Sequence, residues 1–159
     1  PDGAGQVPAL TPGINTLSVS CLNQIPETAS APLSVQVWSG EFDKDDLAAF
    51  TPDVDAPLVA IDGNVALSDA NDVADIMALD TVIEVAGNFR LTGSDIRYLN
   101  NGNGVSNITK VGGDLQVSGH DDQGATLAFP LETVEFPSLV SVGGGVLAQL
   151  ELLFKQRRF

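Results

Sequence analysis

A seven-residue phrase recurs four times, at residues 61–67, 85–91, 111–117 and 142–148, and it constrains the fold more than any other feature. Each copy has Ile or Val first, Gly third, Asn, Asp or Gly fourth, and apolar residues at the fifth and seventh positions. The copies start 24, 26 and 31 residues apart, and each follows an apolar residue placed three positions earlier. A fixed phrase at such intervals predicts a solenoid of stacked repeats.

The residue types of the phrase predict a strand that follows a tight corner. Glycine permits a positive φ angle or a close approach of neighbouring backbones at the corner. The following apolar-x-apolar triplet directs two side chains inward and one outward. Stacking the copies predicts two inner columns, one of Val65, Phe89, Leu115 and Val146 and one of Leu67, Leu91, Val117 and Ala148. It also places Asn64, Asn88 and Asp114 at equivalent corners, where we expect a ladder of structural hydrogen bonds.

The rest of the chain divides around these repeats. Residues 1–32 are rich in Pro, Gly, Ser and Thr and are expected to form an N-terminal cap or linker, with a strand over 14–21. Residues 33–150 form the repeat region of about five rungs, whose degenerate first rung aligns Val35 with Val65 and Val37 with Leu67. Short helices are predicted over 42–50 and 71–79, one helical turn over 94–99, and a helical tail over 151–159.

Three copies of the phrase with their flanks resemble the repeats of the receptor L-domain superfamily. The matching stretches are 82–91, 108–117 and 136–144. Such repeats occur in receptor ectodomains, in fungal cell-wall proteins and in secreted bacterial proteins. The resemblance implies a mainly β, right-handed β-solenoid related to leucine-rich repeats, which is non-catalytic and extracellular or at the cell surface. Because Cys21 is the only cysteine, the cysteine-poor microbial members are the more similar ones.

Composition excludes several partner classes. The net charge of −14 disfavours nucleic acid and anionic membranes, which require clustered Lys and Arg. No apolar run is long enough to span a membrane. The single His120 lies too close along one loop to Ser118, and to Asp121 or Asp122, to form a catalytic triad easily. We therefore expect neither a catalytic residue nor a bound cofactor.

Acidic side chains leave two further readings open. They include Asp69, Asp72, Asp75, Asp95, Asp121 and Asp122. A carboxylate pair would suit a fragment of a polysaccharide-active enzyme, and acidic loops suit calcium. No calcium-binding motif is present, so no metal ligand is assigned and calcium remains only an alternative.

The outward strand positions carry the predicted binding surface. When the copies are aligned, these outward positions form a flat stripe of hydroxyls and amides, with the single tryptophan at one end. The predicted contact residues of this stripe are Trp38, Arg90, Thr92, Gln116 and Ser118. Rigid aromatic side chains supply contact area at small entropic cost. The sequence thus predicts a binding or scaffold domain for a protein or glycan. A self-associating structural subunit is the first alternative, and an ordinary solvated sheet face is the bland interpretation of the stripe.

Overall fold

The computed structural model describes residues 10–17, 33–51, 53–68, 76–92, 98–99, 104–118 and 131–149. These residues are mainly β structure in parallel and mixed sheets, as the sequence predicts. The expected tail at 151–159, and all of the predicted N-terminal segment except 10–17, lie outside the described residues. Among the described residues, no helix has the length and apolarity to cross a membrane.

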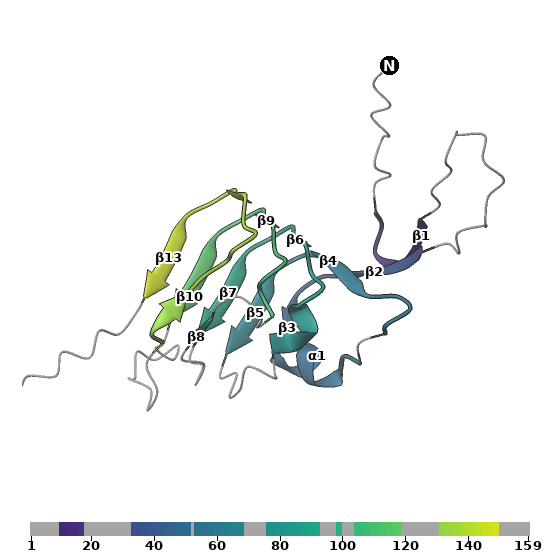
Figure 1. Cartoon of the computed structure of the whole chain (residues 1–159), viewed down its shortest axis with the longest axis horizontal. Coiled ribbons are helices and arrows are strands. Elements are labelled where there is room, and N and C mark those ends of the chain that lie inside the picture. Colours follow the sequence, from purple (N-terminus) through teal and green to yellow (C-terminus); the bar gives the residue numbers. More distant parts are fainter. Residues whose placement is uncertain are drawn as a thin grey trace, which may run out of the picture.

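Two sheets contain nearly all of the described strands. Within each sheet, successive strands lie side by side in Figure 1. The first has the order β1 (Gly13–Leu17), β2 (Leu33–Ser39), β4 (Leu58–Asp62), β6 (Glu84–Val85), β9 (Lys110–Val111) and β12 (Ser141–Val142). The second has the order β13 (Val146–Gln149), β10 (Leu115–Ser118), β7 (Phe89–Thr92), β5 (Val65–Ser68) and β3 (Phe42–Asp43). A small third sheet joins β8 (Tyr98–Leu99) to β11 (Thr133–Val134). Only β1 runs antiparallel to its neighbour among these pairs.

Each copy of the phrase places its first residue in the six-stranded sheet and its last three in the five-stranded sheet. The predicted register is confirmed, because Phe89 pairs with Val65 on one side and with Leu115 on the other. Leu115 in turn pairs with Val146. Connections of different length therefore return the chain to the same position in each unit.

The predicted register of the first unit is wrong. Phe42, not Val35, pairs with Val65, and Trp38 pairs with Ile61. Residues 38–44 thus take the place of a fifth version of the phrase, with glycine third and Phe42 fifth, but Trp38, Glu41 and Lys44 depart from it at the first, fourth and seventh positions. Gly40 has a positive φ of 93°, and the β2–β4 register shifts between Gln36 and Val37. Val35 and Val37 are spaced like the two apolar residues of the triplet, and this similarity led to the wrong alignment of the first unit.

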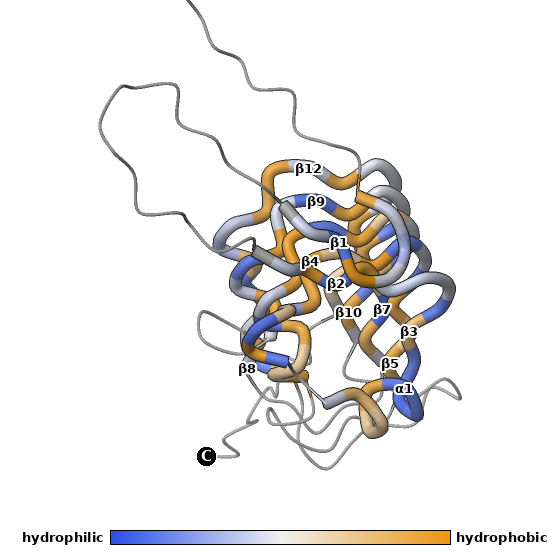
Figure 2. The backbone as a smooth tube through the Cα atoms, turned by 90° about the vertical axis from the view of Figure 1, so that its right-hand side faces the viewer, coloured by the Kyte–Doolittle hydropathy of each residue, from blue (hydrophilic) through white to orange (hydrophobic). Residues whose placement is uncertain are grey.

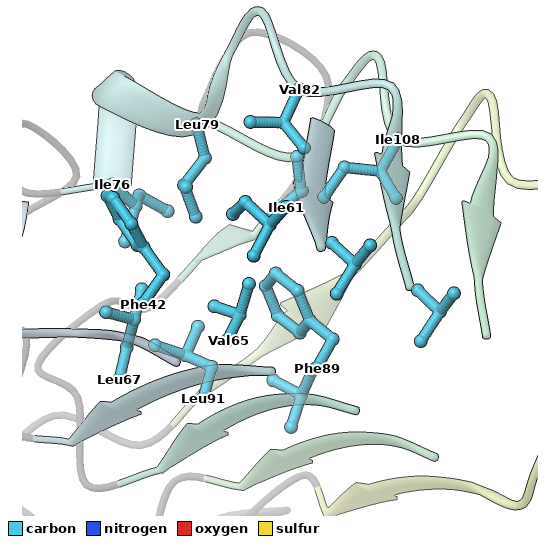
Figure 3. Packing of buried hydrophobic residues seen from close by; sticks show 14 of the residues in the cluster. Phe42, Ile61, Val65, Leu67, Ile76, Leu79, Val82, Phe89, Leu91 and Ile108 are labelled. Carbon is cyan, nitrogen blue, oxygen red and sulfur yellow. The ribbon is translucent and has the colours of Figure 1, made fainter. Parts of the chain in front are cut away.

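The hydrophobic core lies between the two sheets. In Figure 3, Ile61 of the first sheet points toward Val65 and Phe89 of the second. The tube in Figure 2 shows apolar residues within the strands of both sheets. The connections also contribute buried side chains, which are Ile76, Leu79, Leu99, Val105 and Leu131. The strands and their connections therefore enclose one continuous apolar interior.

The connections differ from one another, as loops of repeat proteins commonly do. Helix α1 (Lys44–Ala49) is capped at its N-terminus by Asp43, whose carboxylate accepts from the N–H groups of Asp45 and Asp46 in a capping box. The described part of the next predicted helix is a 3₁₀ turn, η1 (Met77–Leu79). The helical turn expected over 94–99 is wrong at its end, because Tyr98 and Leu99 form a strand that pairs with Thr133 and Val134.

The corners hold successive units at close range. The side-chain oxygen of Asn64 accepts from the N–H of Asn88 at 2.9 Å, and that of Asn88 accepts from Asp114 at 2.8 Å. Asp114 then accepts from the N–H of Gly145 at 2.7 Å. A Cβ atom built on Gly63 would lie 1.9 Å from the carbonyl oxygen of Gly40. Glycine at this corner therefore serves close backbone approach, and its φ is not positive.

The two ends of the stack differ. At the N-terminal end, β1 covers β2, and α1 packs its buried Leu47 beside β3 and β5. At the other end, Val146 is 65% exposed and Ala148 is also exposed, so the expectation of buried inner columns is wrong for this last unit. A terminal repeat has a neighbour on one side only, which is the physical reason.

Candidate functional site: a recess beside Trp38

A recess of about 380 Å³ opens at the N-terminal end of the six-stranded sheet. Its lining combines one tryptophan and several aliphatic residues with one glutamine and one serine. Pockets for small ligands have this general make-up, with a few polar groups that fix orientation. Its lining residues are Gly13, Ile14, Gln36, Val37, Trp38, Ser39 and Leu58.

The local sequence fixes the indole ring of Trp38 in the wall of this recess. Its Nε1–H donates to the carbonyl oxygen of Glu41 at 3.0 Å, across the corner that Gly40 forms. The ring meets Phe42 edge to face, with centroids 5.1 Å apart. Phe42 is fully buried and also lies edge-on to Phe50. The half-buried Trp38 is therefore held by contacts within its own unit and needs little ordering on binding.

Strand β1 forms one side of the recess because it pairs antiparallel with β2. Gly13 lies opposite Val37, and Ile14 lies opposite Gln36. Ile14 is 70% exposed, whereas Val37 is buried. An exposed aliphatic side chain beside a half-buried indole ring provides apolar contact area at the mouth of the recess.

The remaining predicted contact residues lie on the other sheet. Arg90 and Gln116 are adjacent across β7 and β10, where Arg90 is exposed and Gln116 is half-buried. Because Trp38 belongs to β2 of the six-stranded sheet, the structure does not bring it together with these two side chains. The predicted single stripe is thus divided between the recess and a row on the five-stranded sheet.

Two members of the predicted stripe do not face solvent. Thr92 is 3% exposed and Ser118 is 5% exposed, and both have polar interactions. The expectation that they are exposed to solvent is therefore wrong, although their pairing positions at the ends of β7 and β10 are as predicted. Ser68 in the same row is half-buried. Buried polar side chains that have interactions of their own suit a structural position better than a contact surface.

The acidic positions give no metal site within the described part of the chain. No group of three or more His, Cys, Asp or Glu residues is gathered there. Asp69, Asp72, Asp75, Asp95, Asp121 and Asp122, with His120, all lie outside the described residues. Calcium binding by these loops therefore stays a prediction from the sequence.

Sequence reasoning named Trp38 but missed the residues around it. Leu58 comes next to Gln36 and Trp38 only because β2 pairs with β4, and Ile14 is added by β1. The sequence feature that could have indicated this arrangement is the incomplete fifth version of the phrase at 38–44, which places Trp38 in the position of Ile61. In comparisons with known proteins, the chain matches no family model, no curated protein and no solved structure.

Proposed function

We propose that this chain is a non-catalytic binding domain, extracellular or at the cell surface, that recognises a protein or glycan ligand through the recess beside Trp38. Its architecture would be a right-handed β-solenoid of the receptor L-domain type. Four copies of the phrase, with residues 38–44 in the place of a fifth, lie in register across two parallel stacks and support this architecture. The observation that carries the functional proposal is the fixed indole ring of Trp38 in the wall of the recess.

The chemistry of the recess favours a neutral, hydroxyl-rich ligand such as a glycan. Trp38 offers an aromatic surface, while Gln36 and Ser39 offer uncharged donors and acceptors. Charged side chains are missing from its lining among the described residues. In a chain of net charge −14, an uncharged recess places little electrostatic restriction on a neutral ligand.

Intrinsic fluorescence tests this proposal directly, because Trp38 is the only tryptophan. Titration with a panel of soluble glycans is expected to shift the emission of the full chain for the true ligand. Trp38→Ala should then weaken binding about tenfold or more, which corresponds to about 1.4 kcal/mol. Arg90→Ala and Gln116→Ala serve as controls and should leave the affinity unchanged.

The controls also show which surface binds if the recess does not. Loss of binding in Arg90→Ala or Gln116→Ala, with normal binding by Trp38→Ala, would move the site to the five-stranded sheet. A peptide that binds with the same Trp38 dependence would identify a protein ligand instead of a glycan. Turnover of a polysaccharide that is lost in an Asp121→Asn, Asp122→Asn variant would favour the enzyme alternative.

A further inference from the structure

The C-terminal end of the strand stack presents an open edge. Its last strands are β12 and β13, and each pairs with only one neighbour among the described strands. Three aliphatic side chains are exposed there, Val140 at 84%, Val146 at 65% and Leu147 at 53%. Natural proteins usually cover or charge such an edge, because its free backbone groups and apolar side chains attract another strand.

The free backbone groups of this edge follow from the units before it. The N–H of Val65 donates to the backbone carbonyl oxygen of Asn88 in the next unit at 2.8 Å, and the N–H of Phe89 donates to that of Asp114 in the same way. Val146 is the equivalent residue of the last unit, so its N–H points to the open edge. Because backbone direction alternates along a strand, Ala148 also directs its N–H and C=O outward.

The last unit has no charged side chain of its own in an otherwise strongly acidic chain, and the carboxylate of Asp114 beside it accepts from the N–H of Gly145. Residues 136–150 contain no Asp, Glu, Lys or Arg, although the whole chain carries a net charge of −14. The equivalent row of the five-stranded sheet contains Asp43 and Arg90, whereas β13 has Leu147 there. Among the described strands, β13 thus combines an unpaired edge with a row position that is exposed and apolar.

We propose that this edge binds a second copy of the chain, with β13 of one copy pairing antiparallel to β13 of the other. Centring the pair on Leu147 lets Val146 and Ala148 of each copy exchange both backbone hydrogen bonds with Ala148 and Val146 of the other. The two Leu147 side chains then face each other as a directly opposed pair. The five-stranded sheet continues across the two-fold axis into the second copy.

A second copy fits this edge for electrostatic and geometric reasons. Two acidic chains repel each other over most of their surfaces, but the last unit brings no charged side chain of its own into direct opposition. The pairing is isologous, so it closes at a dimer. The other end is already covered by β1 and α1, which disfavours continued head-to-tail growth.

Sedimentation equilibrium of the full chain over a wide concentration range tests the proposal. The wild type is expected to show a reversible monomer–dimer equilibrium. Leu147→Lys should raise the dissociation constant at least tenfold, because it opposes two like charges at the axis. Ala66→Lys is the matched control, since it adds the same charge in the same row of the sheet but on an inner strand, and it should change the constant less than twofold.

A cross-linking variant tests the register independently of any loss of stability. Leu147→Cys combined with Cys21→Ser should form disulfide-linked dimers on mild oxidation, because directly opposed residues have Cβ atoms about 4.5–5.5 Å apart. Ala66→Cys with Cys21→Ser should stay monomeric under the same conditions. A monomer mass at every concentration would overturn the proposal and point to residues 150–159 or another protein as the partner of this edge. Dimers that Leu147→Lys and Ala66→Lys weaken equally would overturn it too.

Discussion

The side-chain oxygen of Asn88 leaves no room for a Cβ atom at position 113, because a Cβ built on Gly113 would be only 2.3 Å from it. The same relationship joins Asn64 to Gly87, at 2.4 Å, and Asp114 to Gly144, at 2.1 Å. The oxygen is held there by its hydrogen bond to the next unit's backbone N–H. The glycine of one phrase and the amide or carboxylate of the preceding phrase are therefore physically coupled.

This coupling predicts a non-additive pair of substitutions. Gly113→Ala should destabilise the chain by about 1–3 kcal/mol, because its methyl group displaces the oxygen of Asn88 or shifts the backbone. In an Asn88→Ala background the same substitution should cost less, since the obstructing oxygen is gone. Urea titrations of the four proteins in this double-mutant cycle measure the difference. Purely additive effects would mean that Gly113 is required for another reason.

Glycines at neighbouring corner positions should differ sharply in their tolerance of alanine. A Cβ on Gly112 would lie 2.0 Å from the carbonyl oxygen of Ala86, which is backbone and does not move easily. A Cβ on Gly145 would have its nearest neighbour at 3.7 Å, an ordinary contact distance. Gly112→Ala should therefore lower the free energy of unfolding by about 1–3 kcal/mol. Gly145→Ala should change it by less than about 0.5 kcal/mol. Equal losses in both variants would contradict close approach as the cause.

Substitutions at adjacent residues of β7 should differ in their effect on stability, because one side chain faces the core and the next faces solvent. Phe89 is 1% exposed and meets Phe136 edge to face at 5.6 Å, whereas Arg90 is exposed. Phe89→Ala should cost about 3–5 kcal/mol through the lost burial and the cavity it leaves. Arg90→Ala should cost less than about 0.5 kcal/mol. Comparable midpoint shifts in a denaturant titration would show that the inward and outward positions are assigned wrongly.

Calcium should leave the thermal stability of the full chain almost unchanged if the acidic loops only solvate the surface. A site saturated at 100 times its dissociation constant would instead stabilise the fold by about 2.7 kcal/mol. Differential scanning calorimetry with millimolar calcium, and again with a chelator, distinguishes these cases. A calcium-dependent rise that Asp121→Asn and Asp122→Asn abolish would assign the site to that loop.

Sequence periodicity predicted the repeated part of this fold because each copy of the phrase specifies a corner and a strand together. The pairing of Val65 with Phe89 and of Leu91 with Val117 follows from that spacing alone. The register of the first unit was predicted wrongly because two local patterns competed. Val35 and Val37 alternate as a strand does, while the weaker phrase that starts at Trp38 lacks its last apolar residue.

The candidate site was less predictable than the fold. Trp38 and Gln36 are close in sequence, but the recess also requires Leu58 and Ile14, which long-range pairing brings beside them. Thr92 and Ser118 looked outward-facing because strand alternation was continued to the last residue of each triplet. Their burial shows that alternation no longer determines exposure at the ends of β7 and β10, where the connections begin.

The unequal connections have a consequence for engineering. Successive phrases lie 23, 24, 26 and 31 residues apart, yet the corners hold the strands in one register. Register is thus decoupled from loop length, so a foreign peptide inserted after β10 would add chain without displacing β12 or β13. The entropic cost of such an insertion grows only slowly with its length. The chain accordingly offers a rigid frame on which loops of different lengths can be displayed.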